Sequence, residues 1–271
     1  MATVEQGGLD AAAVGIGKNQ LNKQNHRQAW PYGNYRSYYS FRSAAGAGTG
    51  AGETSATVAG GEDALDGRLA LLDRSLFDGK VLLDIGTNAG KVAIDAVSHL
   101  GCTRAVGVDI DPLLIQDACA HAADAAEEGV RSRLTFFADS VMQLGWFDAR
   151  REPRLAGVDV VTLFSITKWL HLHHGDAGLL RLFADLHAFL PPGGVLIVEP
   201  QEFANYRRAV KRNPDLRETF KAIELWPPFD RELEAAGFVL ETRIEREEGG
   251  FSRPLLVWRK PAATTGAAEG A

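Results

Sequence analysis

The stretch VLLDIGTNAG, residues 81–90, contains the pattern that decides the fold of this chain. An apolar run with one acid leads into a loop that contains Gly86 and Gly90, as where a strand turns into a helix. Glycine lets the backbone adopt a positive φ and approach a ligand closely. A second apolar run ends at Asp109, where a carboxylate can accept hydrogen bonds from both ribose hydroxyls. The stretch predicts a nucleoside-binding turn, with an ordinary strand-to-helix turn as the alternative.

The glycine loop differs from the two common phosphate-binding motifs. It has two of the three glycines of the dinucleotide fingerprint, and it does not match the P-loop pattern. A nucleoside without a pyrophosphate is therefore favoured, and S-adenosylmethionine is the common ligand of that kind. We predict S-adenosyl-L-methionine as the cofactor and S-adenosyl-L-homocysteine as its product.

The rest of the chain alternates between strand and helix patterns. Such alternation requires crossover connections and therefore a mostly parallel sheet. We predict an α/β protein with the class I S-adenosylmethionine-dependent methyltransferase (Rossmann-like) fold, in which a seven-stranded, mostly parallel sheet carries helices on both faces. The predicted strands are 81–85, 105–108, 134–137, 158–164, 195–199, 238–244 and 255–258, and the predicted helices are 69–77, 90–100, 112–128, 176–190 and 203–221.

Composition divides the 271 residues into one globular domain and several flanking segments. We predict a disordered tail over 1–29, an aromatic and basic lid segment over 30–42, a low-complexity insertion over 43–65, the methyltransferase domain over 66–261 and a second disordered tail over 262–271. The lid is expected to order over the cofactor and the acceptor when both are bound.

Charge and hydropathy exclude several classes of protein. The net charge of −6 argues against a nonspecific polyanion binder, and no apolar run approaches the roughly 18 residues of a membrane span. We therefore predict no membrane partner. Cys102 and Cys119 are too few for a disulfide framework and are typical of a reduced compartment. The predicted location is the nucleus, with the cytoplasm also open.

Basic residues gather at two places in spite of the acidic balance. Between Lys18 and Arg42 five basic residues and no acid are interleaved with aromatic residues, which can stack on bases while arginines hold phosphates. A second cluster comprises Arg207, Arg208, Lys211 and Arg212. For this second cluster a solvated helix face is the alternative.

The carboxyl ends of the predicted strands bring several side chains to one edge of the sheet, where ligands of such sheets bind. Gly86 to Asn88 would pass under the methionine portion, Asp109 would take the ribose and Ile110 would flank the adenine. Asp139 and Ser140 fit a contact to the adenine amino group, although Asp139 could instead be a turn or cap residue.

After the fourth strand the sequence FSITKWLHLHHGD, residues 164–176, supplies a lysine and three histidines. Lys168 could neutralise an anionic acceptor at the mouth of the pocket, and a surface lysine is the alternative. His171, His173 and His174 lack the cysteine or carboxylate that would complete a usual ligand set. We predict no metal site.

Seven segments together resemble the methylphosphate capping enzyme family, the bicoid-interacting-type RNA 5′-phosphate methyltransferases. They are YGNYRSYYSFR (32–42), DGRL (66–69), LLDIGTNAGK (82–91), GVDID (107–111), SITKWLHLHHGD (165–176), LPPGGVLIVEPQ (190–201) and FSRPLLVW (251–258). The resemblance implies an enzyme that uses S-adenosylmethionine to methylate the 5′-terminal phosphate, typically the γ-phosphate, of a small noncoding RNA. Ribonucleoprotein components are a further candidate partner.

The resemblance also implies roles for individual residues. Residues implied to hold the RNA 5′ phosphate are Tyr38, Arg42 and Lys168, with His171 nearby. Residues implied to contact the cofactor are Tyr39, Arg68, Gly86, Thr87, Asn88, Asp109, Ile110, Asp139, Ser140 and Phe164. The sequence ADS, residues 138–140, stands where the family has GNY.

Phosphate methylation suits these residue types. A terminal phosphate has a second pKa near 6, so its oxygen is already anionic at neutral pH and needs no general base. The reaction needs alignment, which can supply roughly 7–11 kcal/mol. Two alternatives remain open: a methyltransferase for another acceptor, and a noncatalytic RNA-binding scaffold of a ribonucleoprotein.

Overall fold

A computed structural model describes residues 32–33, 65–125, 127–245 and 253–262 of the chain. Tyr38, Tyr39 and Arg42 lie outside the described residues, as do the predicted tail 1–29 and most of the predicted segments 30–42, 43–65 and 262–271.

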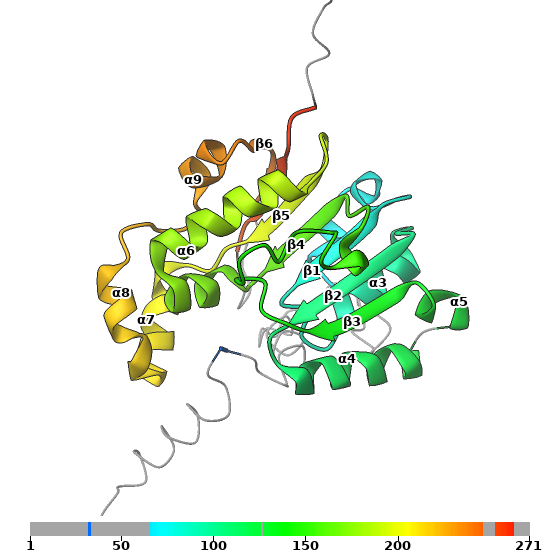
Figure 1. Cartoon of the computed structure of the whole chain (residues 1–271), viewed down its shortest axis with the longest axis horizontal. Coiled ribbons are helices and arrows are strands. Elements are labelled where there is room, and N and C mark those ends of the chain that lie inside the picture. The colour runs from blue at the N-terminus through cyan, green and yellow to red at the C-terminus, as the bar shows by residue number, and fades with distance from the viewer. Residues whose placement is uncertain (1–31, 34–64, 126, 246–252, 263–271) are drawn as a thin grey trace, which may run out of the picture.

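A seven-stranded sheet forms the centre of the described domain, in the order β3-β2-β1-β4-β5-β7-β6 (Figure 1). Neighbours within the first five strands are parallel, and β7 is antiparallel to both β5 and β6. The predicted mostly parallel sheet is therefore confirmed. The strands are β1 (Val81–Ile85), β2 (Arg104–Asp109), β3 (Leu134–Ala138), β4 (Val160–Phe164), β5 (Val195–Glu199), β6 (Val239–Ile244) and β7 (Leu255–Arg259).

Helices cover both faces of this sheet, as predicted. Alternate residues of β1 point to opposite faces, so Leu83 packs in one core cluster with Leu182 and Leu186, while Leu82 packs in the other with Ala93. The α-helices are α3 (Lys91–His99), α4 (Pro112–Ala125), α5 (Glu128–Arg131), α6 (Thr167–Phe189), α7 (Phe203–Arg212), α8 (Arg217–Ala222) and α9 (Asp230–Ala235). No described helix combines the length and apolar character needed to span a bilayer.

Two predicted helices are interrupted in the structure. Residues 69–77 form two short 3-10 turns, η1 (Leu69–Leu71) and η2 (Arg74–Leu76), because Asp73 between them is extended and its carboxylate accepts a hydrogen bond from Ser75 N. The predicted helix 203–221 is divided where Pro214 removes a backbone donor and holds Asn213 extended.

The helix predicted over 176–190 starts earlier than expected. Helix α6 begins at Thr167 and continues to Phe189, with a kink at Gly175, whose φ is 65° and ψ is −174°. Glycine tolerates this conformation because it has no Cβ. As a result Lys168 and His171 lie on the first turns of a helix that starts at the end of β4.

Candidate active site

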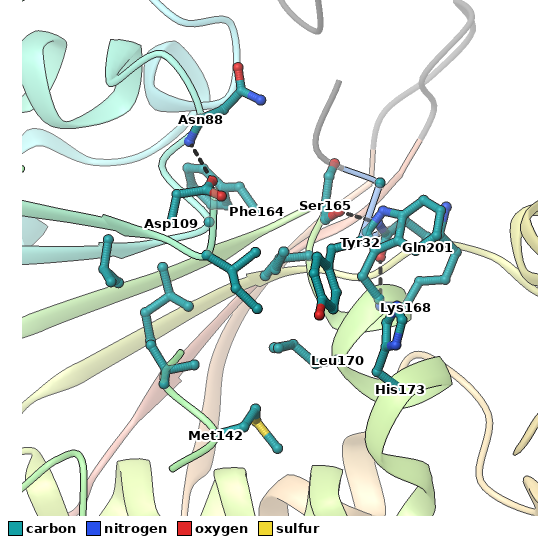
Figure 2. Close-up of a pocket in the computed structure, with 18 of the residues that line it drawn as sticks. Tyr32, Asn88, Asp109, Met142, Phe164, Ser165, Lys168, Leu170, His173 and Gln201 are labelled. Atoms are coloured by element: carbon teal, nitrogen blue, oxygen red, sulfur yellow. Dashed lines mark hydrogen bonds between the residues drawn. The ribbon is translucent and has the colours of Figure 1, made fainter. Parts of the chain in front are cut away.

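A cavity of about 340 Å³ lies at the carboxyl ends of the parallel strands (Figure 2). This is the edge where the strand pattern predicted a ligand site. Nine of the predicted site residues line it: Arg68, Gly86, Asn88, Asp109, Ile110, Asp139, Ser140, Phe164 and Lys168. Tertiary structure therefore gathers residues from five separate parts of the sequence around one space.

The glycine loop closes tightly under the cavity. Gly86 has a φ of 76°, and its N–H donates to the Val108 carbonyl at 2.8 Å. A Cβ at Gly86 would stand 3.0 Å from Ile166, and one at Gly90, with a φ of 78°, would stand 2.9 Å from Phe136. Both glycines are thus required by backbone conformation and by space.

The Asp109 carboxylate is the acid predicted to hold a ribose. It is buried at the end of β2, and it accepts hydrogen bonds from Asn88 N at 3.0 Å and from Asp111 N at 3.1 Å (Figure 2). Burial raises the pKa of Asp109 to about 6, against the opposing effect of these two hydrogen bonds. The group is therefore mostly ionised at pH 7 and still has acceptor capacity toward the cavity.

Asp139 both lines the cavity and holds its own turn. Its carboxylate accepts hydrogen bonds from Gln143 Nε2 at 2.7 Å, Ser140 N at 2.8 Å and Trp146 Nε1 at 2.9 Å. The turn role that the sequence left open is therefore present in the structure. A contact from Asp139 or Ser140 to the adenine stays a prediction.

Arg68 is a buried cation held by two acids. Its guanidinium forms two hydrogen bonds with Asp66, at 2.7 and 2.8 Å, lies 3.6 Å from a Glu199 oxygen and covers the Phe164 ring at 4.5 Å from the centroid. Pairing of this kind is what permits a charge to be buried. Arg68 thus reaches the cavity from a fixed position, as its predicted cofactor role requires.

Thr87 and His171, two further predicted site residues, are not among the residues that line the cavity. Thr87 is fully buried, and its hydroxyl packs against Gly107, where a Cβ would stand 2.7 Å from it. His171 is also fully buried and hydrogen-bonds Tyr206 Oη at 3.2 Å and Asp176 at 2.6 Å. Both side chains are therefore packed inside the protein.

The buried His171 ties α6 to a distant segment. Asp176 bonds His171 and also accepts the backbone N–H of Glu224 at 2.8 Å. Burial lowers the pKa of His171, against the raising effect of Asp176. We therefore assign His171 a positioning role for the helix that carries Lys168.

Gln201 also lines the cavity. In the sequence it was noted only as the last residue of the segment LPPGGVLIVEPQ, 190–201. Its Oε1 accepts hydrogen bonds from Thr167 Oγ1 at 3.1 Å and from Lys168 N at 3.0 Å, while its Nε2 donates to the Ser165 carbonyl (Figure 2). Ser165 has a φ of 58°, a strained conformation for a residue with a side chain. Gln201 therefore caps the start of α6 and holds the turn before it. A polar residue two positions after a buried central strand was the available signal.

Removing this cap should lower both stability and turnover. We expect Gln201→Leu to cost about 1–3 kcal/mol of unfolding free energy, because the buried N–H of Lys168 loses its acceptor. Gln201→Glu retains an acceptor for that N–H but loses the donor to Ser165, so it should lose activity with a smaller loss of stability. Chemical denaturation and steady-state kinetics on both variants would check this, and a Gln201→Leu protein with unchanged stability and kcat would contradict it.

Lys168 occupies the opposite side of the cavity from Asp109 (Figure 2). Its ammonium lies over the Trp169 ring, 4.2 Å from the centroid. Burial lowers the pKa of Lys168 to about 7, with a further lowering from Arg253 and Arg212. The alternative of an ordinary surface lysine does not fit this environment.

Two residues of the predicted lid segment are described, and both lie at the cavity. The Tyr32 ring is 4.8 Å from the His173 ring, centroid to centroid. Gly33, with a φ of 72°, lies so close to Trp169 that a Cβ would stand 1.9 Å from the indole. This part of segment 30–42 therefore packs on the first turns of α6, while closure of the segment over a ligand stays a prediction.

Helix α6 carries His171, His173 and His174, and histidine is a common metal ligand. Within the described ranges, no group of three or more histidine, cysteine or acidic side chains is arranged to hold a metal ion.

The strand order, the glycine turn and the cavity together define a class I methyltransferase fold. A solved structure with a similar fold is that of the N-methyltransferase NodS of Bradyrhizobium japonicum in complex with S-adenosyl-L-homocysteine. The TM-score is 0.52, and the match covers 72% of this chain and 84% of that chain at 17% sequence identity. The model of the family described as Bicoid-interacting protein 3 (Bin3) matches residues 158–260.

Sequence relatives identify the family. The U6 snRNA methylphosphate capping enzyme Amus of Drosophila melanogaster is 32% identical over 88% of this chain and 77% of its own length. A probable RNA methyltransferase of Arabidopsis thaliana is 28% identical over 88% of this chain and 83% of its own. This chain belongs to the methylphosphate capping enzyme family, of the bicoid-interacting type.

Proposed function

We propose that this protein transfers the methyl group of S-adenosyl-L-methionine to the 5′-terminal phosphate, the γ-phosphate where the end is a triphosphate, of a small noncoding RNA. The product would be a capped and stabilised RNA. We propose the nucleus as the place where it acts, with the cytoplasm as the alternative, and components of a ribonucleoprotein as further partners.

The observation that carries the proposal is the separation of charge within one cavity. The acids that line it, Asp84, Asp109 and Asp139, follow or belong to the strands β1, β2 and β3. Of the cations that line it, Arg68 is paired with Asp66, and Lys168, Arg208, Arg212 and Arg253 come from α6, α7 and the residues before β7. A nucleoside bound by Asp109 and an anion bound by the cations would meet between the two sides.

The residues present fit the cofactor. Gly86 of the glycine turn lines the cavity, Asp109 offers a fixed acceptor for ribose hydroxyls, and exposed Ile110 offers an apolar surface for the base. When bound, S-adenosylmethionine would supply an electrophilic methyl group on sulfur. The electron pair of the broken carbon–sulfur bond would stay on the sulfur.

The acceptor side of the cavity fits a phosphate oxygen. A terminal phosphate is largely dianionic at pH 7, so the protein has to orient it and does not have to remove a proton. Lys168 is a compact cation for this task, and it gains a proton when an anion binds because its pKa is lowered to about 7 in the free protein. Tyr38 and Arg42, which lie outside the described residues, are proposed to bind the phosphate together with Lys168.

Transfer of labelled methyl to a defined RNA end tests the function. We expect label on an RNA with a 5′ triphosphate and none on the same RNA after phosphatase treatment. Label on RNA that was treated with phosphatase before the assay would favour a methyltransferase that modifies another part of the acceptor. Binding of RNA without methyl transfer, and without cofactor binding in calorimetry, would favour the noncatalytic scaffold.

A further inference from the structure

Ser165 has a backbone conformation that its side chain disfavours. It directly follows β4, lines the cavity beside Gln201 and Lys168, and has a φ of 58° (Figure 2). A Cβ is strained in this left-handed region, and such strain is often found at functional sites. Glycine would adopt the same turn without the strain. The contacts of the hydroxyl account for a serine at this position.

The first partner of the hydroxyl is Glu199. Phe164 and Glu199 are paired in register at the ends of β4 and β5, so the next residue, Ser165, stands beside the carboxylate. Ser165 Oγ donates a hydrogen bond to Glu199 Oε2, and Ser165 N donates to the Glu199 carbonyl at 3.2 Å. Glu199 is fully buried and lies behind the residues that line the cavity. Because the hydroxyl proton is directed to Glu199, its oxygen remains an acceptor for another donor.

The second partner of the hydroxyl is Arg253, which precedes β7. Because β7 is antiparallel to β5, the residues before β7 stand beyond the carboxyl end of β5. Arg253 Nη1 donates to Ser165 Oγ at 2.8 Å, and Arg253 is only 9% exposed and lines the cavity. The charge of Arg253 also helps to lower the pKa of Lys168, so the two cations are neighbours.

We propose that Ser165 is a positioning residue for the acceptor: its hydroxyl, oriented by Glu199, fixes the guanidinium of Arg253 where it binds a phosphate oxygen beside Lys168. The proposal rests on the proposed function and adds Ser165 and Arg253 to the residues that carry it. An arginine has several rotatable bonds, so fixing it before the ligand arrives removes an entropic cost from binding. The serine hydroxyl is neutral, so this contact orients the guanidinium without neutralising its charge.

A fixed guanidinium supplies what an ammonium does not. Methyl transfer requires an oxygen held on the line of the carbon–sulfur bond that breaks. Lys168 is a compact charge that sets little direction, whereas the planar guanidinium of Arg253 binds oxygens in a fixed geometry. The strain at Ser165 is therefore offset by the alignment of the acceptor.

Two substitutions of Ser165 separate the hydroxyl from the turn. Ser165→Ala removes the hydroxyl and keeps a strained Cβ, whereas Ser165→Gly removes both. We expect each to lower kcat/KM for a 5′-phosphorylated RNA about tenfold, as the loss of a hydrogen bond to a charged group implies. Ser165→Gly should be the more stable of the two in chemical denaturation, and the affinity of both for S-adenosylhomocysteine should stay nearly unchanged. A Ser165→Gly protein with full activity would overturn the proposal.

A double-mutant cycle tests the link between Ser165 and Arg253. Arg253→Gln should lower kcat/KM at least as much as Ser165→Gly, and the double variant should lose little more than Arg253→Gln alone, because the hydroxyl acts through the guanidinium. Fully additive losses would overturn the proposal, since Ser165 would then act on its own. Arg259→Gln is a matched control: it removes the same charge from the far end of β7, where Arg259 pairs with Glu241, and should leave kcat/KM unchanged.

A binding measurement separates this inference from the proposed function. In calorimetry with inorganic phosphate, Ser165→Gly and Arg253→Gln should both bind more weakly than the wild-type protein. A protein that methylates RNA phosphate ends but binds phosphate equally well in all three forms contradicts only the positioning role. A protein whose two variants both lose phosphate affinity, and whose wild type transfers no methyl group to RNA, contradicts only the proposed function.

Discussion

Replacing Lys168 with alanine is expected to lower kcat for RNA methylation by about 10²-fold or more, the usual cost of removing one fixed electrostatic group from an active site. The affinity for S-adenosylhomocysteine should stay nearly unchanged, because Lys168 lies across the cavity from Asp109 and the glycine loop (Figure 2). Steady-state kinetics and calorimetry on the same preparation would measure the two quantities. A large loss of cofactor affinity in this variant would show that Lys168 is assigned to the wrong ligand.

The pH dependence gives Lys168 a second test. Because the pKa of Lys168 is lowered to about 7, its ammonium is present below pH 7 and is lost in the free protein as the pH rises above it. The KM for RNA should therefore rise above pH 7. Lys168→Arg keeps the charge at every accessible pH, so this rise should disappear even where the variant is less active. A rise that persists in Lys168→Arg would have to come from another group.

Replacing Asp109 with asparagine is expected to weaken cofactor binding by about 10²-fold or more. The carboxylate would accept two charge-assisted hydrogen bonds from the ribose, each contributing about 1.5–3 kcal/mol. The asparagine NH₂ would also face the N–H donors of Asn88 or Asp111, which now donate to the carboxylate. Calorimetry with S-adenosylhomocysteine would measure the loss.

Acid should weaken the wild-type cofactor site in the same way. The pKa of Asp109 is raised to about 6, so its charge is present above that pH and is lost as the pH falls through it. Affinity should fall by up to tenfold per pH unit below pH 6 and should be insensitive to pH in Asp109→Asn. Asp111→Asn is a matched control, since Asp111 does not line the cavity; because the charge of Asp111 helps to raise the pKa of Asp109, this variant should move the fall in affinity to lower pH without abolishing it. Equal affinities of wild type and Asp109→Asn at pH 7 would remove Asp109 from the site.

Strand positions and the residues at strand ends could be predicted from the sequence alone. The predicted strands 81–85 and 195–199 coincide with β1 and β5. Continuous apolar runs bounded by glycine, proline and acids are a local signal, and the parallel sheet that they imply brings its carboxyl ends to one edge. Gly86, Asp109 and Lys168 could therefore be assigned to one site before any coordinates.

Other features depend on contacts between distant segments. Gln201 caps α6 across 33 positions of sequence, so the early start of that helix at Thr167 could not be read from its own residues. His171 carries no local sign of burial, and its partner Tyr206, 35 positions away, becomes a neighbour only after folding. A basic helix likewise does not reveal which of its arginines face a cavity.

The amino-acid pattern determined the class of fold, the edge of the sheet where a ligand binds and most of the residue types found there, because strand and turn signals are local and parallel strands share one direction. Tertiary packing decided which predicted residues reach the cavity. It buried Thr87 and His171, and it placed Arg208 and Arg212 at the cavity that Lys168 also lines. The physical reason is that side-chain direction depends on how whole elements pack, which no single stretch of sequence specifies.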